Sequence, residues 1–227
     1  MPSPRSCLAA VLLAAGLSGC QSVRYVEAFH PEGAIYRVEL TVDSGDVRLQ
    51  AGDRLRVERA IKAPEGALAL SHHIREGVLI LEASCSSFAP CAVDTVLDIP
   101  AGLPVAVNLG DGTIEVDGLR SVDVRLDRGS VSVMDAERVV VRVGEGTVDA
   151  ELGGTASATI SVAKGDIHMG LGADAWRLAV TAHHLQLQGV ASDDDAPGVL
   201  ELMAPGGTVE LHRSEAVGVV AMGMSRD

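Results

Sequence analysis

The feature that most constrains the fold of this 227-residue chain is a pattern of five apolar positions that recurs around a glycine. Around Gly112, apolar residues lie seven, five and three positions before the glycine and two and four positions after it. The pattern fits seven segments, and all 35 of its positions are apolar. The segments are centred on Gly45, Gly112, Gly129, Gly146, Gly165, His183 and Gly207. The period of two on each side of the centre predicts β-strands with one buried face and one exposed face.

The spacing of the segments predicts how they are arranged. From Gly112 onward the centres are 17, 17, 19, 18 and 24 residues apart, as in a repeat array whose units bury their apolar faces against their neighbours. The buried positions on either side of the glycine are an odd number of residues apart, so the strand must bend there. We predict an all-β fold, a β-solenoid with 17–19-residue rungs and two facing sheets, in which the glycines form the corners. A hairpin meander or β-sandwich with the glycines in tight turns is the alternative.

The first 20 residues predict a targeting segment. Arg5 supplies a positive charge, and the apolar stretch that follows is too short to span a bilayer. Leu17-Ser18-Gly19-Cys20 matches the bacterial lipobox, whose cysteine receives a lipid that anchors the protein to a membrane. An ordinary secretory signal with a chance cysteine is the alternative.

The lipobox divides the chain into three expected parts: a signal peptide over 1–19, a lipidated tether over 20–34 and a β-repeat domain over 35–227. Gln21 follows the cysteine in place of an aspartate, which favours the outer membrane of a Gram-negative envelope. Loss of Arg5 with the signal leaves 17 Lys and Arg against 31 Asp and Glu, a net charge of −14. Such an acidic surface repels nucleic acid, so we expect no nucleic-acid partner.

Cys85 and Cys91 are the cysteines that remain when Cys7 and Cys20 are set aside. In an exported protein, two such thiols are expected to form a disulfide across the intervening loop. A redox or metal role would favour a CxxC spacing and a histidine partner.

Two kinds of polar cluster are candidates for cation binding. Asp193, Asp194 and Asp195 interrupt the array and are interpreted as a solvated loop, with calcium binding by their carboxylates as the alternative. His72-His73 and His183-His184 are adjacent pairs, and neighbouring residues of a strand point to opposite faces, so neither pair forms a chelate by itself.

One outward-facing column of the array carries the candidate chemistry. If the rungs stack in chain order, it contains Glu115, Ser132, Asp149, His168, Gln186 and Glu210. We interpret these as solvated surface residues, and an acid–base or metal site at Asp149 beside His168 is the alternative. Glu115 and Asp149 are the column's pair of carboxylates for glycan hydrolysis. We predict no catalytic, cofactor-binding or metal site from these residues.

The ends of the array are less regular. Residues 36–99 hold the first copy of the pattern and further strand-like runs that start or cap the array. Residues 216–224 (AVGVVAMGM) are apolar enough to form one more strand or a cap.

Residues 96–119 (VLDIPAGLPVAVNLGDGTIEVDGL) resemble the putative-adhesin domain family of bacterial envelope proteins. The segments VDVRLDRGSVSV, VVVRVGEGTVDA and ATISVAKGDIHM extend the resemblance to about residues 36–215. The resemblance implies a β-solenoid at the cell surface or in the periplasm and carries no catalytic residues. We therefore expect a non-catalytic, lipid-anchored envelope protein with a binding or structural role, whose partner is a glycan or an envelope protein. A glycan-active β-solenoid enzyme is the alternative.

Overall fold

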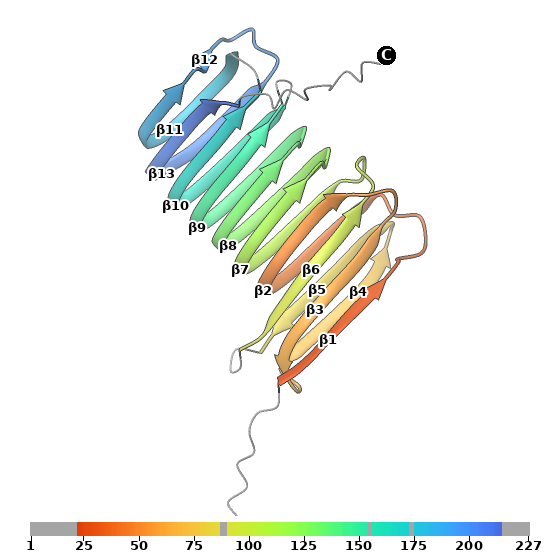
Figure 1. Cartoon of the computed structure of the whole chain (residues 1–227). Helices are drawn as coiled ribbons and strands as arrows, with labels where there is room; N and C mark the ends of the chain where they lie inside the picture. The colour runs from red at the N-terminus through yellow and green to blue at the C-terminus, as the bar shows by residue number, and fades with distance from the viewer. Residues whose placement is uncertain (1–21, 87–89, 154–155, 173–174, 215–227) are drawn as a thin grey trace, which may run out of the picture.

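The computed structural model describes residues 22–86, 90–153, 156–172 and 175–214, which form thirteen β-strands and no helix (Figure 1). The all-β prediction is confirmed. The strands are β1 (Ser22–Phe29), β2 (Arg37–Ala51), β3 (Arg56–Pro64), β4 (Leu68–Arg75), β5 (Val78–Cys85), β6 (Ala92–Ile99), β7 (Val105–Asp117), β8 (Ser121–Met134), β9 (Arg138–Leu152), β10 (Ser157–Leu171), β11 (Ala175–Gln188), β12 (Ala191–Ser192) and β13 (Val199–Arg213). The described residues contain no helix that is long and apolar enough to cross a membrane.

The seven repeats correspond to seven long strands, β2, β7 to β11 and β13, of 13 to 15 residues each. Neighbouring repeats pair in parallel and in register, so that Gly112 lies opposite Gly45 on one side and Gly129 on the other. Tight hairpins would instead pair the two halves of one repeat in antiparallel fashion, so the hairpin alternative is wrong. Parallel pairing of each repeat on the next is the pairing that a solenoid requires.

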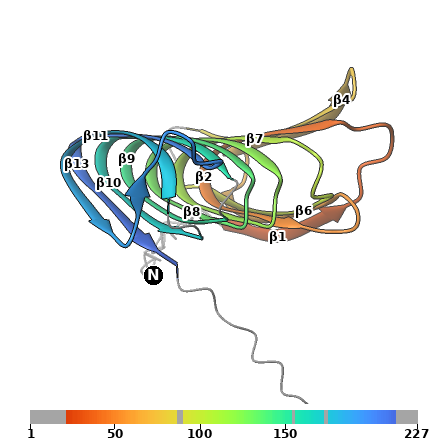
Figure 2. The same cartoon turned by 90° about the horizontal axis from the view of Figure 1, so that it is seen from above.

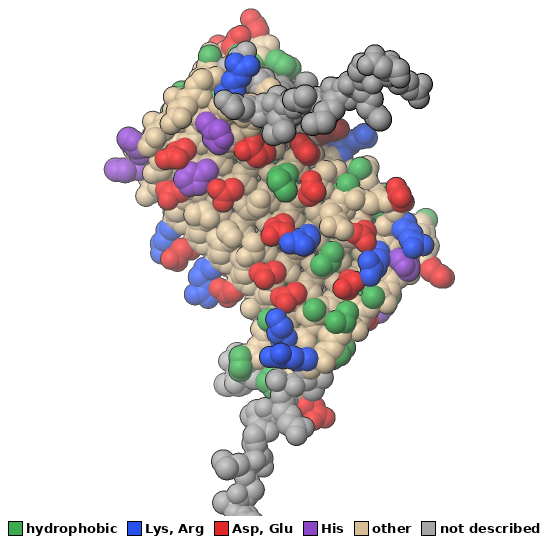
Figure 3. Space-filling model, viewed as in Figure 1, with side chains coloured by type: hydrophobic (Ala, Val, Ile, Leu, Met, Phe, Trp, Pro, Cys, Tyr) green, Lys and Arg blue, Asp and Glu red, His purple; other side chains and the backbone are tan. Residues whose placement is uncertain are grey.

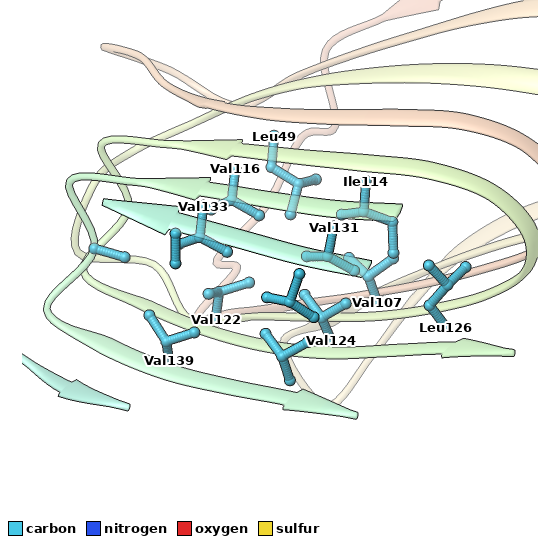
Figure 4. Close-up of a cluster of buried hydrophobic side chains, with 14 of the residues drawn as sticks. Leu49, Val107, Ile114, Val116, Val122, Val124, Leu126, Val131, Val133 and Val139 are labelled. Atoms are coloured by element: carbon cyan, nitrogen blue, oxygen red, sulfur yellow. The ribbon is translucent and has the colours of Figure 1, made fainter. Parts of the chain in front are cut away.

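Six of the long strands bend at a central glycine, and the two halves of each strand face each other across an apolar interior (Figure 2). In β11 the central residue is His183, and Leu185 and Leu187, which the pattern predicts to be buried, are 44% and 45% exposed. Val122 and Val124 from the first half of β8 lie opposite Val131 and Val133 from the second half, and all four are at most 2% exposed (Figure 4). At the bend, Gly129 has a φ of +136°, and an added Cβ would collide with the carbonyl oxygen of Gly112 on the previous rung. The corner therefore requires glycine because the stacked backbones leave no room for a side chain.

The last two repeats do not stack in chain order. β13 lies between β10 and β11, so Gly207 sits on Gly165 and the His183 repeat is outermost. Our expectation of sequential stacking is wrong here for a steric reason. The Gly207 corner fits closely against the Gly165 rung, whereas the β11 ladder shifts between Ala182 and His184, where a side chain occupies the corner. A repeat with a side chain at its corner fits best where no further rung must stack on it.

The irregular N-terminal part extends the two facing sheets. β5 pairs with the first half of β2 and β6 with its second half, so together they form one divided rung. A disulfide between Cys85 and Cys91, with Cα atoms 5.8 Å apart, closes the loop between its two parts. β4 then adds to β5 and β3 to β6, both in antiparallel fashion.

The N-terminal boundary of the domain differs from the expected one. β1 pairs along its whole length with β3, with Ser22 opposite Pro64 and Phe29 opposite Val57. Residues 22–29 are therefore part of the sheet and not of a tether over 20–34. The sequence gives no alternating apolar pattern there because β1 is an edge strand. Residues 1–19, Cys20 and 216–224 lie outside the described residues.

Candidate functional site

The column of residues singled out in the sequence lies on the outer face of the second halves of the long strands, and the structure adds Arg48 of β2 to it. We call it the outer column, and its spatial order is Arg48, Glu115, Ser132, Asp149, His168, Glu210 and Gln186. Glu210 precedes Gln186 because β13 lies between β10 and β11. The column thus brings His168 between two carboxylates, those of Asp149 and Glu210.

An ion pair divides two hollows at the N-terminal end of the outer column. Nη2 of Arg48 lies 2.6 Å from Oε2 of Glu115. One hollow of about 200 Å³ includes Asp46, Asp94 and Thr113 in its lining, and the other, of about 400 Å³, includes Asp117, Ser132 and Met134. Arg48 and Glu115 line both hollows. This part of the face offers a guanidinium, carboxylates and hydroxyls to a ligand with many hydrogen-bonding groups.

At the other end of the outer column, His168 contacts Glu210 and not Asp149. Its Nδ1 lies 3.2 Å from Oε2 of Glu210. Asp149 and His168 are neighbours in the ladder, as the sequence predicted, but the carboxylate that His168 contacts is that of Glu210. The insertion of β13 supplies the competing carboxylate.

A second histidine–carboxylate pair lies in the adjacent column. Oε1 of Glu151 is 3.8 Å from Nε2 of His212, and Ser214 donates a hydrogen bond from Oγ to Oε2 of Glu151. The Glu151 side chain reaches them across Gly170, where a Cβ would collide with the carboxylate. The serine hydroxyl is bonded to the carboxylate and not to the histidine, so the group does not have the geometry of an activated nucleophile. Figure 3 shows several histidines over the C-terminal strands, close to acidic side chains, and another histidine towards the N-terminal end.

The two carboxylates proposed for glycan hydrolysis do not share a cleft. Glu115 and Asp149 are separated by Ser132 in the outer column, and Asp149 lines neither of the hollows beside Glu115. Glu115 is also held by Arg48. The geometry therefore gives no support to the glycan-active alternative.

The other candidate ligands are dispersed. Asp195 donates its backbone N–H to Oδ1 of Asp193 at 2.9 Å, as in a local turn. The His72 ring stacks on Phe29 with centroids 4.4 Å apart. Across the described parts of the chain, no group of three or more His, Cys, Asp or Glu residues is placed to hold a metal ion.

A further hollow, of about 330 Å³, lies on the opposite outer face and was not predicted from the sequence. It is lined by Asp43, Asn108, Arg125 and Asp127 around Gly110. Gly110 has no side chain to fill the hollow, and a Cβ at this position would collide with the carbonyl oxygen of Asp43. The signal in the sequence is weak, because the outward position of Gly110 is also a glycine in one other repeat, Gly144, and is Asp, Ala, Thr or Pro in the rest.

Comparison with known proteins gives likenesses of shape and none of sequence. No family profile matches the chain, and no curated protein sequence matches it either. Among solved structures, a putative cell adhesion protein from Clostridium sporogenes is 12% identical, with a TM-score of 0.45, and the match covers 86% of this chain and 100% of that one. A putative adhesin from Bacteroides fragilis is 8% identical, with a TM-score of 0.33 and coverage of 85% and 98%.

A third solved structure, described as a putative lipid binding protein from Parabacteroides distasonis, is 9% identical, with a TM-score of 0.31 and coverage of 84% and 97%.

Proposed function

We propose that this protein is a non-catalytic, adhesin-like recognition module of the bacterial cell envelope, held at a membrane by a lipid on Cys20. The observation that carries the proposal is the pair of hollows on the outer column, which share the Arg48–Glu115 ion pair. Their hydroxyls and ionised groups suit a hydroxyl-rich ligand such as a neutral glycan, or a polar surface of an envelope protein. The names of the solved structures with a similar shape agree with this role.

The fold gives the proposed anchor a defined orientation. β1 begins at Ser22, two residues after Cys20, so a lipid there holds the N-terminal end of the array at the membrane. Seven long strands then stack away from that end (Figure 1). At about 4.8 Å per strand, they extend the outer faces roughly 30 Å from the anchored module. With this anchor, the proposed location is the cell envelope, at the outer membrane if the host is Gram-negative.

The recognition role is tested by capture. The mature chain from residue 20, made soluble by Cys20→Ser, is immobilised and exposed to purified envelope polysaccharides and to solubilised envelope proteins. We expect saturable capture of one component, lost in the Arg48→Met, Glu115→Gln double variant. Arg142→Met is the matched control, because Arg142 pairs with Asp123 on the opposite outer face.

Three results would contradict the proposal. These are no saturable capture, equal capture by the double variant, and release of sugar fragments from a polysaccharide. The last would instead support the glycan-active enzyme.

The anchor is tested separately by growing cells with a labelled fatty acid. Label is expected on the wild-type protein and not on the Cys20→Ser variant, with the N-terminus of the mature protein at Cys20. Unlabelled wild-type protein in the soluble fraction would refute the anchor and leave the recognition role to be judged by capture.

A further inference from the structure

At its N-terminal end, the apolar interior lies between two edge strands, β1 and β4, which contact each other through the stacked rings of Phe29 and His72. Within the described sheet, β1 pairs with β3 and β4 pairs with β5. A hollow of about 250 Å³ lies at this end. Its lining is mostly apolar and consists of Tyr25, Ile61, Ala63, Pro64, Glu65, Gly66, Leu68 and Leu70.

Beside this hollow, the apolar pattern of the interior is interrupted by a row of polar residues. Glu27, Arg59 and Thr95 are paired across β1, β3 and β6, and the same row continues into the array as Val47 and Ile114. Arg59 and Thr95 are each 1% exposed. Burying a guanidinium lowers the stability of a fold unless its N–H donors are hydrogen-bonded, so the presence of Arg59 in this row calls for an explanation.

The protein satisfies the buried guanidinium only in part. Nη2 of Arg59 donates to the backbone oxygen of Ser71, on β4, at 3.3 Å. Nε and Nη1 of Arg59 and Oγ1 of Thr95 have no hydrogen-bond partner. Burial lowers the pKa of the Arg59 guanidinium, and the nearby Glu27 and Tyr25 raise it. Glu27 thus acts on the charge through space without bonding to its free donors.

The hollow and the unsatisfied guanidinium are next to each other. Ile61 lines the hollow and follows Arg59 at the next inward position of β3. Tyr25 also lines the hollow and is close enough to act on the charge of Arg59. This apolar hollow, which we call the channel, therefore lies next to a buried cation with free N–H donors, and Arg59 itself is not among the residues that line it.

We propose that this channel binds a single-chain amphiphile with a carboxylate head, a fatty acid, with its carboxylate on Arg59 and its chain between β1 and β4. Guanidinium matches a carboxylate through paired N–H donors, and the free donors of Arg59 lack a partner in the protein itself. The apolar walls remove the acyl chain from water. The chain leaves beside Pro64 and Gly66, at the turn between β3 and β4.

The source of the ligand follows from the position of this turn. Ser22 is paired with Pro64, so the exit of the channel lies where the polypeptide enters the sheet from Cys20. If Cys20 carries the proposed anchor, the exit faces the membrane, and the fatty acid comes from there. Only this source rests on the proposed function, because binding itself depends on residues of β1, β3 and β4.

The test is a titration of the soluble mature chain, carrying Cys20→Ser, with cis-parinaric acid and with its methyl ester. We expect saturable binding of the acid and much weaker binding of the ester. Arg59→Met removes the charge and keeps the length of the side chain. It is expected to weaken binding of the acid about tenfold to a hundredfold, the effect of losing a charge-assisted hydrogen bond, and to leave the ester unchanged.

Two further variants separate recognition from folding. Leu70→Trp fills the channel and is expected to abolish binding of both probes, while Arg142→Met on the outer face binds as wild type. Arg59→Met is expected to keep or raise the midpoint of urea unfolding, because it removes an incompletely paired buried charge.

Equal affinity for the acid and the methyl ester would overturn the proposal, because the carboxylate would then play no part in binding. It would indicate instead an apolar groove that suits the ester-linked acyl chains of the protein's own anchor. Unchanged binding of the acid by Arg59→Met would overturn it too. So would loss of stability in Arg59→Met without loss of binding, which would assign Arg59 a purely structural role. Each of these outcomes leaves the capture experiment on the outer column unaffected, so the two proposals fail independently.

Discussion

A side chain at a corner of the array would have two effects, backbone strain and steric overlap with the neighbouring rung. Three glycines allow these two effects to be measured separately. Gly102 has no positive φ and no atom within 4 Å of an added Cβ. Gly66 has a φ of +74° and also has open space around an added Cβ. Gly129 combines a φ of +136° with a Cβ position nearer to the Gly112 carbonyl than the 3.0 Å that real Cβ atoms keep. Alanine at Gly102 therefore serves as a control with neither effect, and alanine at Gly66 introduces backbone strain alone. Alanine at Gly129 introduces backbone strain together with steric overlap.

The expected free energies of unfolding follow from these differences. Gly102→Ala should be neutral or stabilising by up to about 1 kcal/mol, because alanine restricts the unfolded chain. Gly66→Ala places a side chain in the left-handed region and should cost about 1–2 kcal/mol. Gly129→Ala adds backbone strain of about 1–3 kcal/mol to the separation of two rungs, which weakens ladder hydrogen bonds worth about 1 kcal/mol each. Its total cost should be about 3–5 kcal/mol, a large part of the stability of an ordinary domain.

The assay is urea unfolding of the soluble mature chain, followed by circular dichroism, with the three variants measured in parallel. The expected order of destabilisation is Gly129→Ala, then Gly66→Ala, then Gly102→Ala. If Gly129→Ala lost no more stability than Gly66→Ala, contact between stacked backbones would not be what requires glycine at the corner. The account of the rung order given above would then fail as well.

Two further predictions concern the disulfide and the rung order. Replacing Cys85 and Cys91 by serine should lower the free energy of unfolding by about 2 kcal/mol, because the closed loop is short; an unchanged urea midpoint would contradict this. Cysteines at Ser161 and Met203, which are neighbours on β10 and β13, should form a disulfide on mild oxidation. Cysteines at Ser161 and Thr181 should not form a disulfide, since β13 separates their strands by about 10 Å. A disulfide in the second pair and not in the first would show that the rungs stack in chain order.

The interior of the array could be predicted from the sequence because burial imposes a period that single residues reveal. In β7 the five predicted positions, Val105, Val107, Leu109, Ile114 and Val116, are all at most 3% exposed. The odd interval across Gly112 also predicted the bend, because a straight strand cannot turn both sets of side chains inward.

The order of the rungs could not be predicted in the same way. Parallel rungs with the same apolar pattern are nearly interchangeable, so the pattern does not say which repeat is the neighbour of which. The replacement of the corner glycine by His183 was a signal of an end position, but it indicated a turn substitution just as well. The pairing of His168 with Glu210 depends on this order and was missed for the same reason.

The N-terminal strand β1 was missed because an edge strand does not need a strict alternation of apolar and polar residues. The inward positions of β1 include Tyr25, Glu27 and Phe29, a mixture that shows no apolar alternation. The strand is fixed by its backbone pairing with β3, which leaves no mark in the sequence. The candidate site beside Arg59 depends on this strand, so the sequence could not show it either.

One row of inward-facing residues changes from apolar to polar towards the N-terminal end, and this change points to a functional role. The row that contains Val47 is apolar through Ile114, Val131, Val148, Ile167 and Val209, each at most 1% exposed. Towards β1 the same row becomes Thr95, Arg59 and Glu27. Outer positions vary at little cost in stability, whereas a buried guanidinium with free donors destabilises the fold unless something outside the chain completes it. If Arg59→Met stabilises the free protein and weakens its binding of a fatty acid, this departure from the apolar pattern is the mark of a ligand.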